Sequence, residues 1–311
     1  MKSTRILERC VFLTGANEFI GSVIVSELIH AGHSVLGLTR SDAGANALIS
    51  AGAQAYRGSL EDLNSLRIGA EQSDGVIHCA YNDDLSNAEE NDRNEAQAIE
   101  ALSSGLEGSN CPLISTSVVG MGAAAPGQLA TEDFFDPNTF NPRKTTEIAA
   151  STALERGVNV SIVRLAQVHN TAKQGFVSML AQVAREKGIS GYNGDGANRW
   201  PAVHVLDAAR LYRLSLQRHE PGARYHAVDE EGIPMRQIAE TIGAGLKIPV
   251  VSVSPEEAKS HFGWFAMFVD MDMPASSSRT QQLVRWLPSG PGLIHDLERS
   301  FSPMRGRAMK A

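Results

Sequence analysis

The octapeptide TGANEFIG, residues 14–21, holds the residues whose types and spacing point most directly to chemistry. It lies between an apolar run that ends at Thr14 and a helical pattern that begins at Phe19. Gly15 permits a tight turn, and Gly21 permits close packing of the helix on the strand. Because free N–H groups at a helix start bind phosphate, the segment predicts a dinucleotide-binding turn.

Glu18 stands where such a turn usually has its middle glycine. A Cβ atom therefore projects where the backbone would approach a phosphate, and the carboxylate adds charge repulsion. We expect dinucleotide binding that is weakened but not abolished. The alternative is a strand–turn–helix unit without a ligand.

Short apolar runs alternate with helical patterns through the first half of the chain. The runs predict strands over Cys10–Thr14, Ser34–Thr39, Ala53–Tyr56, Gly75–Ala80, Pro112–Thr116 and Val158–Leu165. The patterns between them predict helices over Phe19–Ala31, Asp42–Ala51, Glu61–Gly69, Ala88–Leu106 and Arg143–Arg156, with Asp42 as a candidate cap. Apolar strands separated by helices indicate a parallel sheet covered on both faces. We therefore predict an α/β fold with a Rossmann-type doubly wound parallel sheet.

The regular alternation of apolar runs and helical patterns ends after residue 170. Helices are predicted over Phe176–Lys187, Leu206–Arg218 and Met235–Gly243, and a strand over Arg224–Val228. The aromatic stretch HFGWFAMF, residues 261–268, is expected in a core or as a roof over an apolar substrate. We expect a nucleotide-binding domain over residues 1–170 and a small C-terminal substrate lobe over 171–311, with some segments returning to the sheet.

Composition excludes several classes of protein. Hydrophobic residues make up 42% and charged residues 20%, which is a globular balance. Lys and Arg number 28 against 35 Asp and Glu, so no basic face is expected for nucleic acid. Three widely spaced cysteines and a start without an apolar leader favour a cytoplasmic protein, and no apolar run is long enough to span a membrane. The histidines lack metal-binding spacing, so no metal site is predicted.

Several motifs occur in the order that the extended short-chain dehydrogenases/reductases have them. TGANEFIGS resembles their TGxxGFIGS opening, SLED after the third strand their GDLxD segment, and HCA their HxA. ISTS resembles their serine strand, and NRWP with His204 and Asp207 their later WxxVHxxD stretch. The chain is most similar to an atypical, epimerase/dehydratase-like branch of this family. The resemblance implies a nicotinamide dinucleotide as cofactor.

The resemblance and the turn together assign candidate cofactor residues. They are Gly15, Asn17, Glu18, Phe19, Ile20, Gly21, Thr39, Arg40, Ser59, Leu60, Cys79, Ala80 and His169. An acidic residue at the end of the second strand would select NAD, but Thr39 stands there and Arg40 follows. A guanidinium suits a 2′-phosphate, so we predict NADP(H). The alternative for Arg40 is an ordinary solvent-facing arginine.

The family's Tyr-x-x-x-Lys pair is missing from this chain. Arg143 falls at the position of the tyrosine and Glu147 at that of the lysine. Ser117 best matches the family serine that binds the reacting oxygen, and Thr116 precedes it. We predict that Ser117 and Thr116 position the substrate oxygen, with Arg143 or Tyr81 as electrophile or proton source. Alternatively, Arg143 and Glu147, one helical turn apart, form a surface ion pair, and Tyr81 only packs.

Further pocket candidates lie in the second lobe. Tyr192, Arg199, Trp200 and His204 are expected near the substrate. The leading function is an NADP(H)-dependent oxidoreductase acting on a small carbonyl-bearing metabolite, as a monomer or homodimer. The missing pair and Glu18 leave two alternatives open: a non-redox isomerase, cyclase or dehydratase on the same scaffold, and a non-catalytic nucleotide sensor.

Overall fold

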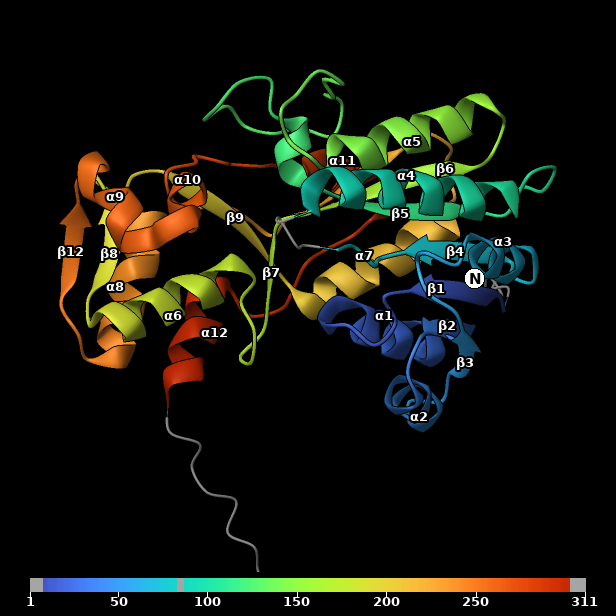
Figure 1. Ribbon diagram of the computed structural model, residues 1–311, viewed down its shortest axis with the longest axis horizontal. Coiled ribbons are helices and arrows are strands. Elements are labelled where there is room, and N and C mark those ends of the chain that lie inside the picture. Colours follow the sequence, from blue (N-terminus) through green and yellow to red (C-terminus); the bar gives the residue numbers. More distant parts are fainter. Residues whose placement is uncertain (1–7, 83–86, 303–311) are drawn as a thin grey trace, which may run out of the picture.

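Seven parallel strands form the central sheet of the computed structural model, which describes residues 8–82 and 87–302 (Figure 1). In spatial order they are β10 (Arg224–Ala227), β6 (Val160–Leu165), β5 (Leu113–Val118), β4 (Gly75–His78), β1 (Cys10–Thr14), β2 (Ser34–Thr39) and β3 (Gln54–Arg57). The chain winds from β1 to one edge and then returns to β4 on the other side of β1. The predicted doubly wound fold is confirmed, and its switch point, where open sheets bind ligands, lies between β1 and β4.

Helices cover both faces of the sheet (Figure 1). One layer contains α1 (Phe19–His30) and α7 (Val205–Arg218), and the other contains α3 (Leu63–Glu71), α4 (Ala88–Ser104) and α5 (Lys144–Glu155). Leu13 of β1 packs in the core with α1 and α7, whereas its neighbour Phe12 packs with the opposite layer. Burial on both faces explains why the strands are apolar without a break. Across the described helices, none combines the length and apolarity that crossing a bilayer requires.

The cap of α2 (Asp42–Ser50) differs from the prediction. Ser41 accepts the backbone N–H of Gly44 on its Oγ at 3.1 Å, so the helix is capped by Ser41 and not by Asp42. Asp42 instead pairs with Arg57 at the end of β3. Serine and aspartate are both good caps, so the sequence did not distinguish these neighbours.

Two small sheets organise the second lobe. One contains β11 (Glu230–Pro234), β9 (Arg199–His204) and β7 (Gln167–His169), and the other contains β12 (Val250–Val253) and β8 (Ser190–Asn193). The helices of this lobe are α6 (Phe176–Lys187), α8 (Met235–Leu246), α9 (Pro255–Phe262), α10 (Ala266–Val269) and α12 (Leu293–Phe301). Short 3-10 turns include η2 (Val119–Gly122), which follows β5, and η3 (Gly263–Phe265) between α9 and α10. Phe262 and Phe265 lie in the lobe core, as predicted, whereas Trp264 is 57% exposed.

The second half of the chain also completes the first lobe. Helix α7 packs on α1, β10 extends the sheet beyond β6, and α11 (Ser278–Val284) packs against α7 and β10. Trp286 is buried in the same core as Leu13 and donates its indole N–H to the carbonyl of Asp207 at 3.0 Å. Segments after residue 170 therefore contribute to both lobes.

Candidate active site at the carboxyl edge of the sheet

The turn between β1 and α1 is fixed against the end of β4. Gly15 has a φ of 70°, and a Cβ atom there would lie 2.8 Å from the backbone nitrogen of Ala80. A Cβ atom at Gly21 would lie 2.0 Å from the carbonyl oxygen of Gly15. Thr14 accepts the N–H of Ala80 on its Oγ1 at 3.2 Å. Both glycines are therefore required by packing, and together they present bare backbone at the sheet edge, as a dinucleotide turn needs.

Glu18 is the N-cap residue of α1, but its side chain makes no capping hydrogen bond. The side chain is exposed. Its charge also acts on Cys79, the residue after β4: burial, and then Glu18, raise the pKa of that thiol to about 12. An anion at this helix start would thus accept hydrogen bonds from backbone N–H groups, but the nearby Glu18 carboxylate would repel it.

Thr39 and Arg40 lie at the end of β2, as predicted. Thr39 is buried, whereas the side chain of Arg40 is exposed. A Cβ atom at Gly44 would lie 2.2 Å from Oγ1 of Thr39 and 2.7 Å from Nδ2 of Asn17, so these three residues lie together. Other predicted cofactor residues follow the same strand ends: Phe19 and Ile20 after β1, Ser59 and Leu60 after β3, and Ala80 after β4.

Thr116 of β5 has a different role from the one predicted. Its hydroxyl donates to the carbonyl of His78 at 2.8 Å, and the hydroxyl of Tyr212 lies 2.7 Å away. Since a threonine has one hydroxyl proton, Tyr212 must donate to Thr116. Thr116 is thus occupied by the protein itself and not available to orient a substrate. Tyr212, on α7, was not predicted because nothing in the sequence placed α7 against β5.

A buried polar chain connects β1, β4 and the two helices above them. Oγ1 of Thr14 lies 2.8 Å from Nδ1 of His78, and Nε2 of His78 lies 3.2 Å from Glu95 of α4. Thr146 of α5 donates to the other oxygen of Glu95 at 2.6 Å. Burial alone would raise the pKa of Glu95, but His78, Arg143 and Thr146 together hold it below its usual value. The chain fixes α4 and α5 to the sheet edge.

Arg143, directly before α5, lies over the end of β5. Its side chain is 9% exposed, and its guanidinium carbon lies 3.6 Å from the centre of the Tyr81 ring. Nη2 donates to the carbonyl oxygen of Thr116, which is free because the pairing of β4 with β5 ends at His78 and Ser115. Nε and Nη1 are buried and have no hydrogen-bond partner among the described residues. Burial raises the pKa of Tyr81, although Arg143 opposes this effect.

Ser117 is completely buried at the end of β5. Its Oγ has no hydrogen-bond partner within the part of the chain that the structure describes. The peptide bond that precedes it is the one whose carbonyl binds Arg143. A buried hydroxyl without a partner is costly in a finished core. Ser117 therefore has an unused donor at the strand end that Arg143 contacts through the Thr116 carbonyl.

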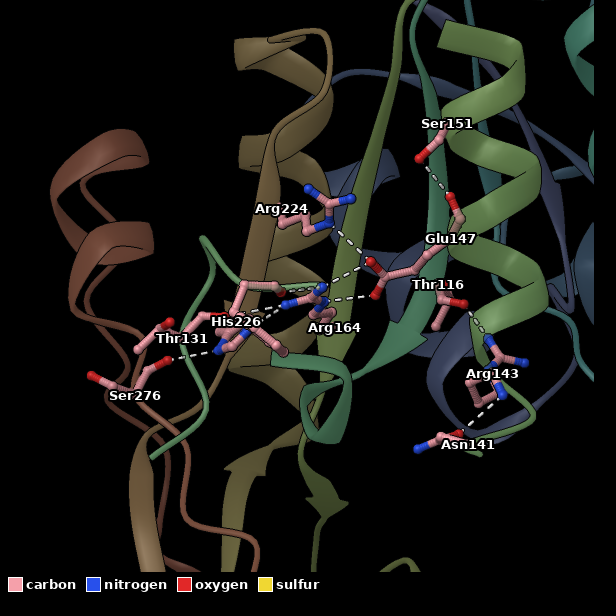
Figure 2. A network of polar contacts seen from close by, with 11 residues as sticks. Thr116, Thr131, Asn141, Arg143, Glu147, Ser151, Arg164, Arg224, His226 and Ser276 are labelled. Atoms are coloured by element: carbon pink, nitrogen blue, oxygen red, sulfur yellow. Dashed lines mark hydrogen bonds and ion pairs between the residues drawn. The ribbon is translucent and has the colours of Figure 1, made fainter. Parts of the chain in front are cut away.

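Glu147 is not paired with Arg143, so the predicted surface ion pair is wrong. Figure 2 shows its carboxylate between two other arginines. It accepts Nε and Nη2 of Arg164 at 2.7 and 2.8 Å, and Nε of Arg224 at 2.9 Å. Glu147 and Arg164 are completely buried. The residue at the position of the family lysine is therefore a structural counter-ion of Arg164 and Arg224.

The rest of the Arg164 guanidinium is bound by two segments distant from it in sequence (Figure 2). It donates to the carbonyls of Thr131 and Phe134 at 3.2 and 2.9 Å, and Nη1 lies 3.2 Å from Nε2 of His226. Nδ1 of His226 lies 2.8 Å from the carbonyl of Ser276, so the proton is on Nδ1 and Nε2 accepts from Arg164. Burial, and then Arg164, lower the pKa of His226 to about 3. The histidine is therefore neutral in the folded protein.

The candidates in the second lobe are mostly structural. Trp200 is 0% exposed and donates its indole N–H to the carbonyl of Met271 at 3.2 Å, so it is a core residue and not a pocket residue. His169 is also completely buried, and its Nδ1 lies 2.8 Å from Asp296. Its contact with a cofactor stays a prediction. Burial lowers the pKa of His169, against the effect of Asp296.

Of the three other predicted residues, Tyr192 and Arg199 are partly exposed, whereas His204 is buried. His204 accepts the N–H of Leu206 at 3.3 Å and thereby caps α7. Arg199 pairs with Asp272 at 2.8 Å. Tyr192 is half-buried. The structure gathers Ser117, Arg143 and Tyr81 at the sheet edge but does not bring these lobe residues into one cluster with them.

Comparison with known proteins gives one family. The model of the NAD dependent epimerase/dehydratase family matches residues 11–229. An uncharacterized protein of Schizosaccharomyces pombe is 46% identical over 288 residues, which cover 92% of this chain and 97% of the relative. An uncharacterized protein of Saccharomyces cerevisiae is 42% identical over 296 residues, covering 94% and 99%.

Solved structures share the fold. A dTDP-glucose 4,6-dehydratase from Streptomyces venezuelae with bound NAD has a TM-score of 0.73 at 18% identity, covering 94% of this chain and 95% of the other. A UDP-glucose 4-epimerase from Thermus thermophilus in complex with NAD has a TM-score of 0.71 at 17% identity, covering 94% and 98%.

The Glu147 ion network gives a stability prediction. Glu147→Gln keeps the volume but leaves two arginines around a neutral amide, so we expect a loss of about 3–5 kcal/mol in the free energy of unfolding. Glu240→Gln, which removes an exposed pair with Arg236, is the control and should cost less than about 0.5 kcal/mol. Urea unfolding measures both, and equal small losses would contradict the role of Glu147.

His226 predicts a dependence of stability on pH. Its folded pKa of about 3 lies below the unfolded value of 6.5, so the unfolded state binds the proton more readily. Stability is therefore complete above about pH 6.5 and falls as the pH is lowered toward 3, by about 2 kcal/mol at pH 5. His226→Gln should lose less stability than wild type between about pH 7 and 5. Exposed His295→Gln is the control, and identical losses in all three proteins would refute this assignment.

Proposed function

The chain belongs to the NAD dependent epimerase/dehydratase family, and we propose that it is an NADP(H)-dependent oxidoreductase acting on a small carbonyl-bearing molecule. One observation carries this proposal. The glycine turn after β1 and two unused donors, the Ser117 hydroxyl and the Arg143 guanidinium, lie at the same edge of the sheet. Open parallel sheets bind ligands at this edge.

The residues at the switch point fit a dinucleotide. The bare backbone at Gly15 and Gly21 and the uncapped start of α1 would hold the diphosphate, with Glu18 reducing the affinity. Thr39 and Arg40 would hold the ribose and its 2′-phosphate. When bound, the nicotinamide would supply or accept a hydride at the substrate carbon.

Ser117 and Arg143 are suited to bind the substrate oxygen. Each has N–H or O–H groups that are already desolvated, and such donors stabilise negative charge that develops on a carbonyl oxygen. Tyr81 lies directly under the guanidinium and is the nearby phenol that could deliver a proton. Tyr81 is protonated at neutral pH, as any tyrosine with a pKa near 10 is, and burial raises its pKa further.

A second candidate function is favoured by Glu147. A glutamate bound by Arg164 and Arg224 cannot take the place of the lysine that the family resemblance leads one to expect. A non-redox isomerase or dehydratase on the same scaffold would tolerate that loss. Proteins of similar fold include a dehydratase and an epimerase.

Cofactor titration followed by turnover tests the proposed function. NADPH should bind, and its nicotinamide absorbance should fall in proportion to the carbonyl compound that is reduced. Conversion of substrate without net loss of NADPH would favour the isomerase or dehydratase. Binding of neither NADPH nor NADH would contradict the oxidoreductase.

Arg40 should select the phosphorylated cofactor. Arg40→Ala should weaken NADPH binding by about 1–3 kcal/mol, the range for hydrogen bonds to charged groups, and leave NADH binding nearly unchanged. Arg57→Ala is the control, because this neighbouring guanidinium is already paired with Asp42. Calorimetric titration of both cofactors measures the effect. Equal losses for NADPH and NADH would show that Arg40 does not bind the 2′-phosphate.

Glu18 should weaken cofactor binding through its bulk and charge. Glu18→Gly should tighten NADPH binding by about 1–2 kcal/mol, roughly five- to thirtyfold, and by more at low ionic strength. Glu18→Gln separates the two causes, since it removes the charge and keeps the bulk. Affinities at two salt concentrations provide the measurement. Unchanged affinity in both variants would mean that Glu18 points clear of the phosphates.

A further inference from the structure

We propose that Arg143 is the receptor for a carboxylate of the substrate, so that the enzyme acts on oxo or hydroxy acids. The inference rests on the proposed function and names its substrate class. Arg143 is a buried cation with unused hydrogen-bond donors. Arg143 is 9% exposed, yet one N–H on Nε and two on Nη1 lack an acceptor among the described residues.

No ion pair joins Arg143 to a carboxylate in the described part of the chain. Among the described residues, Asp92 and Glu95 of α4 are the acidic groups whose charges interact with it. Glu95 is bonded to His78 and Thr146, and Asp92 lies beyond ion-pair distance. Removing a guanidinium from water without a partner is costly, and a bound anion would supply the partner.

The geometry favours a planar anion. The Tyr81 ring stacks on the guanidinium at 3.6 Å and the Thr116 carbonyl holds Nη2, so the plane of the fork is fixed. Nη2 has a second N–H, and together with an N–H of Nε or of Nη1 it forms a fork that matches the two oxygens of a carboxylate. Burial raises the pKa of Asp92, so this neighbouring acid gains a proton more readily beside a bound anion.

The position in the sheet assigns the anion to the substrate and not to the cofactor diphosphate. The glycine turn follows β1, and Arg143 lies over the end of β5, with β4 between these two strands. Two strand spacings are about 10 Å, so the guanidinium lies well away from the phosphate-binding turn. Arg143 binds the carbonyl of the residue before Ser117, so a carboxylate on Arg143 would place the adjacent oxo or hydroxyl carbon at the same strand end as the Ser117 hydroxyl.

Binding of small 2-oxo acids to the protein with NADPH bound tests the proposal. The probes are pyruvate and benzoylformate, each compared with its uncharged methyl ester. Wild type should bind each acid more tightly than its ester. Arg143→Gln should weaken the acids about ten- to a hundredfold and the esters much less, because the esters lack only the carboxylate. Arg143→Lys, which keeps the charge but loses the fork, should be intermediate, and Arg236→Gln on the surface is the control.

The outcomes separate this proposal from the proposed function. NADPH affinity measured on the same variants should not change. Normal NADPH binding with equal affinity for acid and ester in wild type would overturn the carboxylate receptor but leave the oxidoreductase standing. Loss of NADPH affinity in Arg143→Gln would overturn it too, since Arg143 would then be a cofactor ligand. The wild-type comparison of acid with ester needs no variant, so a misfolded variant does not remove the test.

Discussion

The ion pair between Glu147 and Arg164 is the interaction on which the rest of the structure depends. Both side chains are completely buried, and the free positions of the arginine are bound by Thr131, Phe134 and His226. The pair therefore joins α5 to β6, to β10 and to the loop that approaches the sheet edge. A buried pair of this kind is tolerated only when every donor and acceptor is matched. This requirement fixes how α5 lies on the sheet. It therefore also fixes the position of Arg143, the residue directly before that helix.

The site at the sheet edge follows from this arrangement. Glu147 is turned toward Arg164. Arg143, one helical turn before Glu147, therefore lies at the end of β5, over the Tyr81 ring. The polar chain from His78 through Glu95 to Thr146 fixes the same helix from its other side. The edge is thus rigid before any ligand arrives, which is the condition under which fixed donors help a reaction.

Much of the fold was predictable because strands buried on both faces are apolar and helices between them are amphipathic. The turn at Gly15 and Gly21 was also predictable, since close backbone contacts require glycine. The partners of long side chains were not. Nothing in the spacing of Arg143 and Glu147 shows that the glutamate pairs with Arg164 and Arg224, and Tyr212 meets Thr116 only because a helix from the second half packs on the first. Trp200 was wrongly predicted to line a pocket, because the sequence does not distinguish an aromatic residue of a core from one of a pocket.

The return of the chain to its first lobe has a consequence for synthesis. During translation β6 leaves the ribosome long before β10, so it remains an unpaired edge until residues 224–227 follow. Over the same interval Arg164 holds Glu147 but lacks Arg224 and His226. An open strand edge beside an incompletely bound charge favours wrong pairings between nascent chains. The late segment thus acts as a closing strand, and truncations within it should yield chains that need chaperones more than the complete protein does.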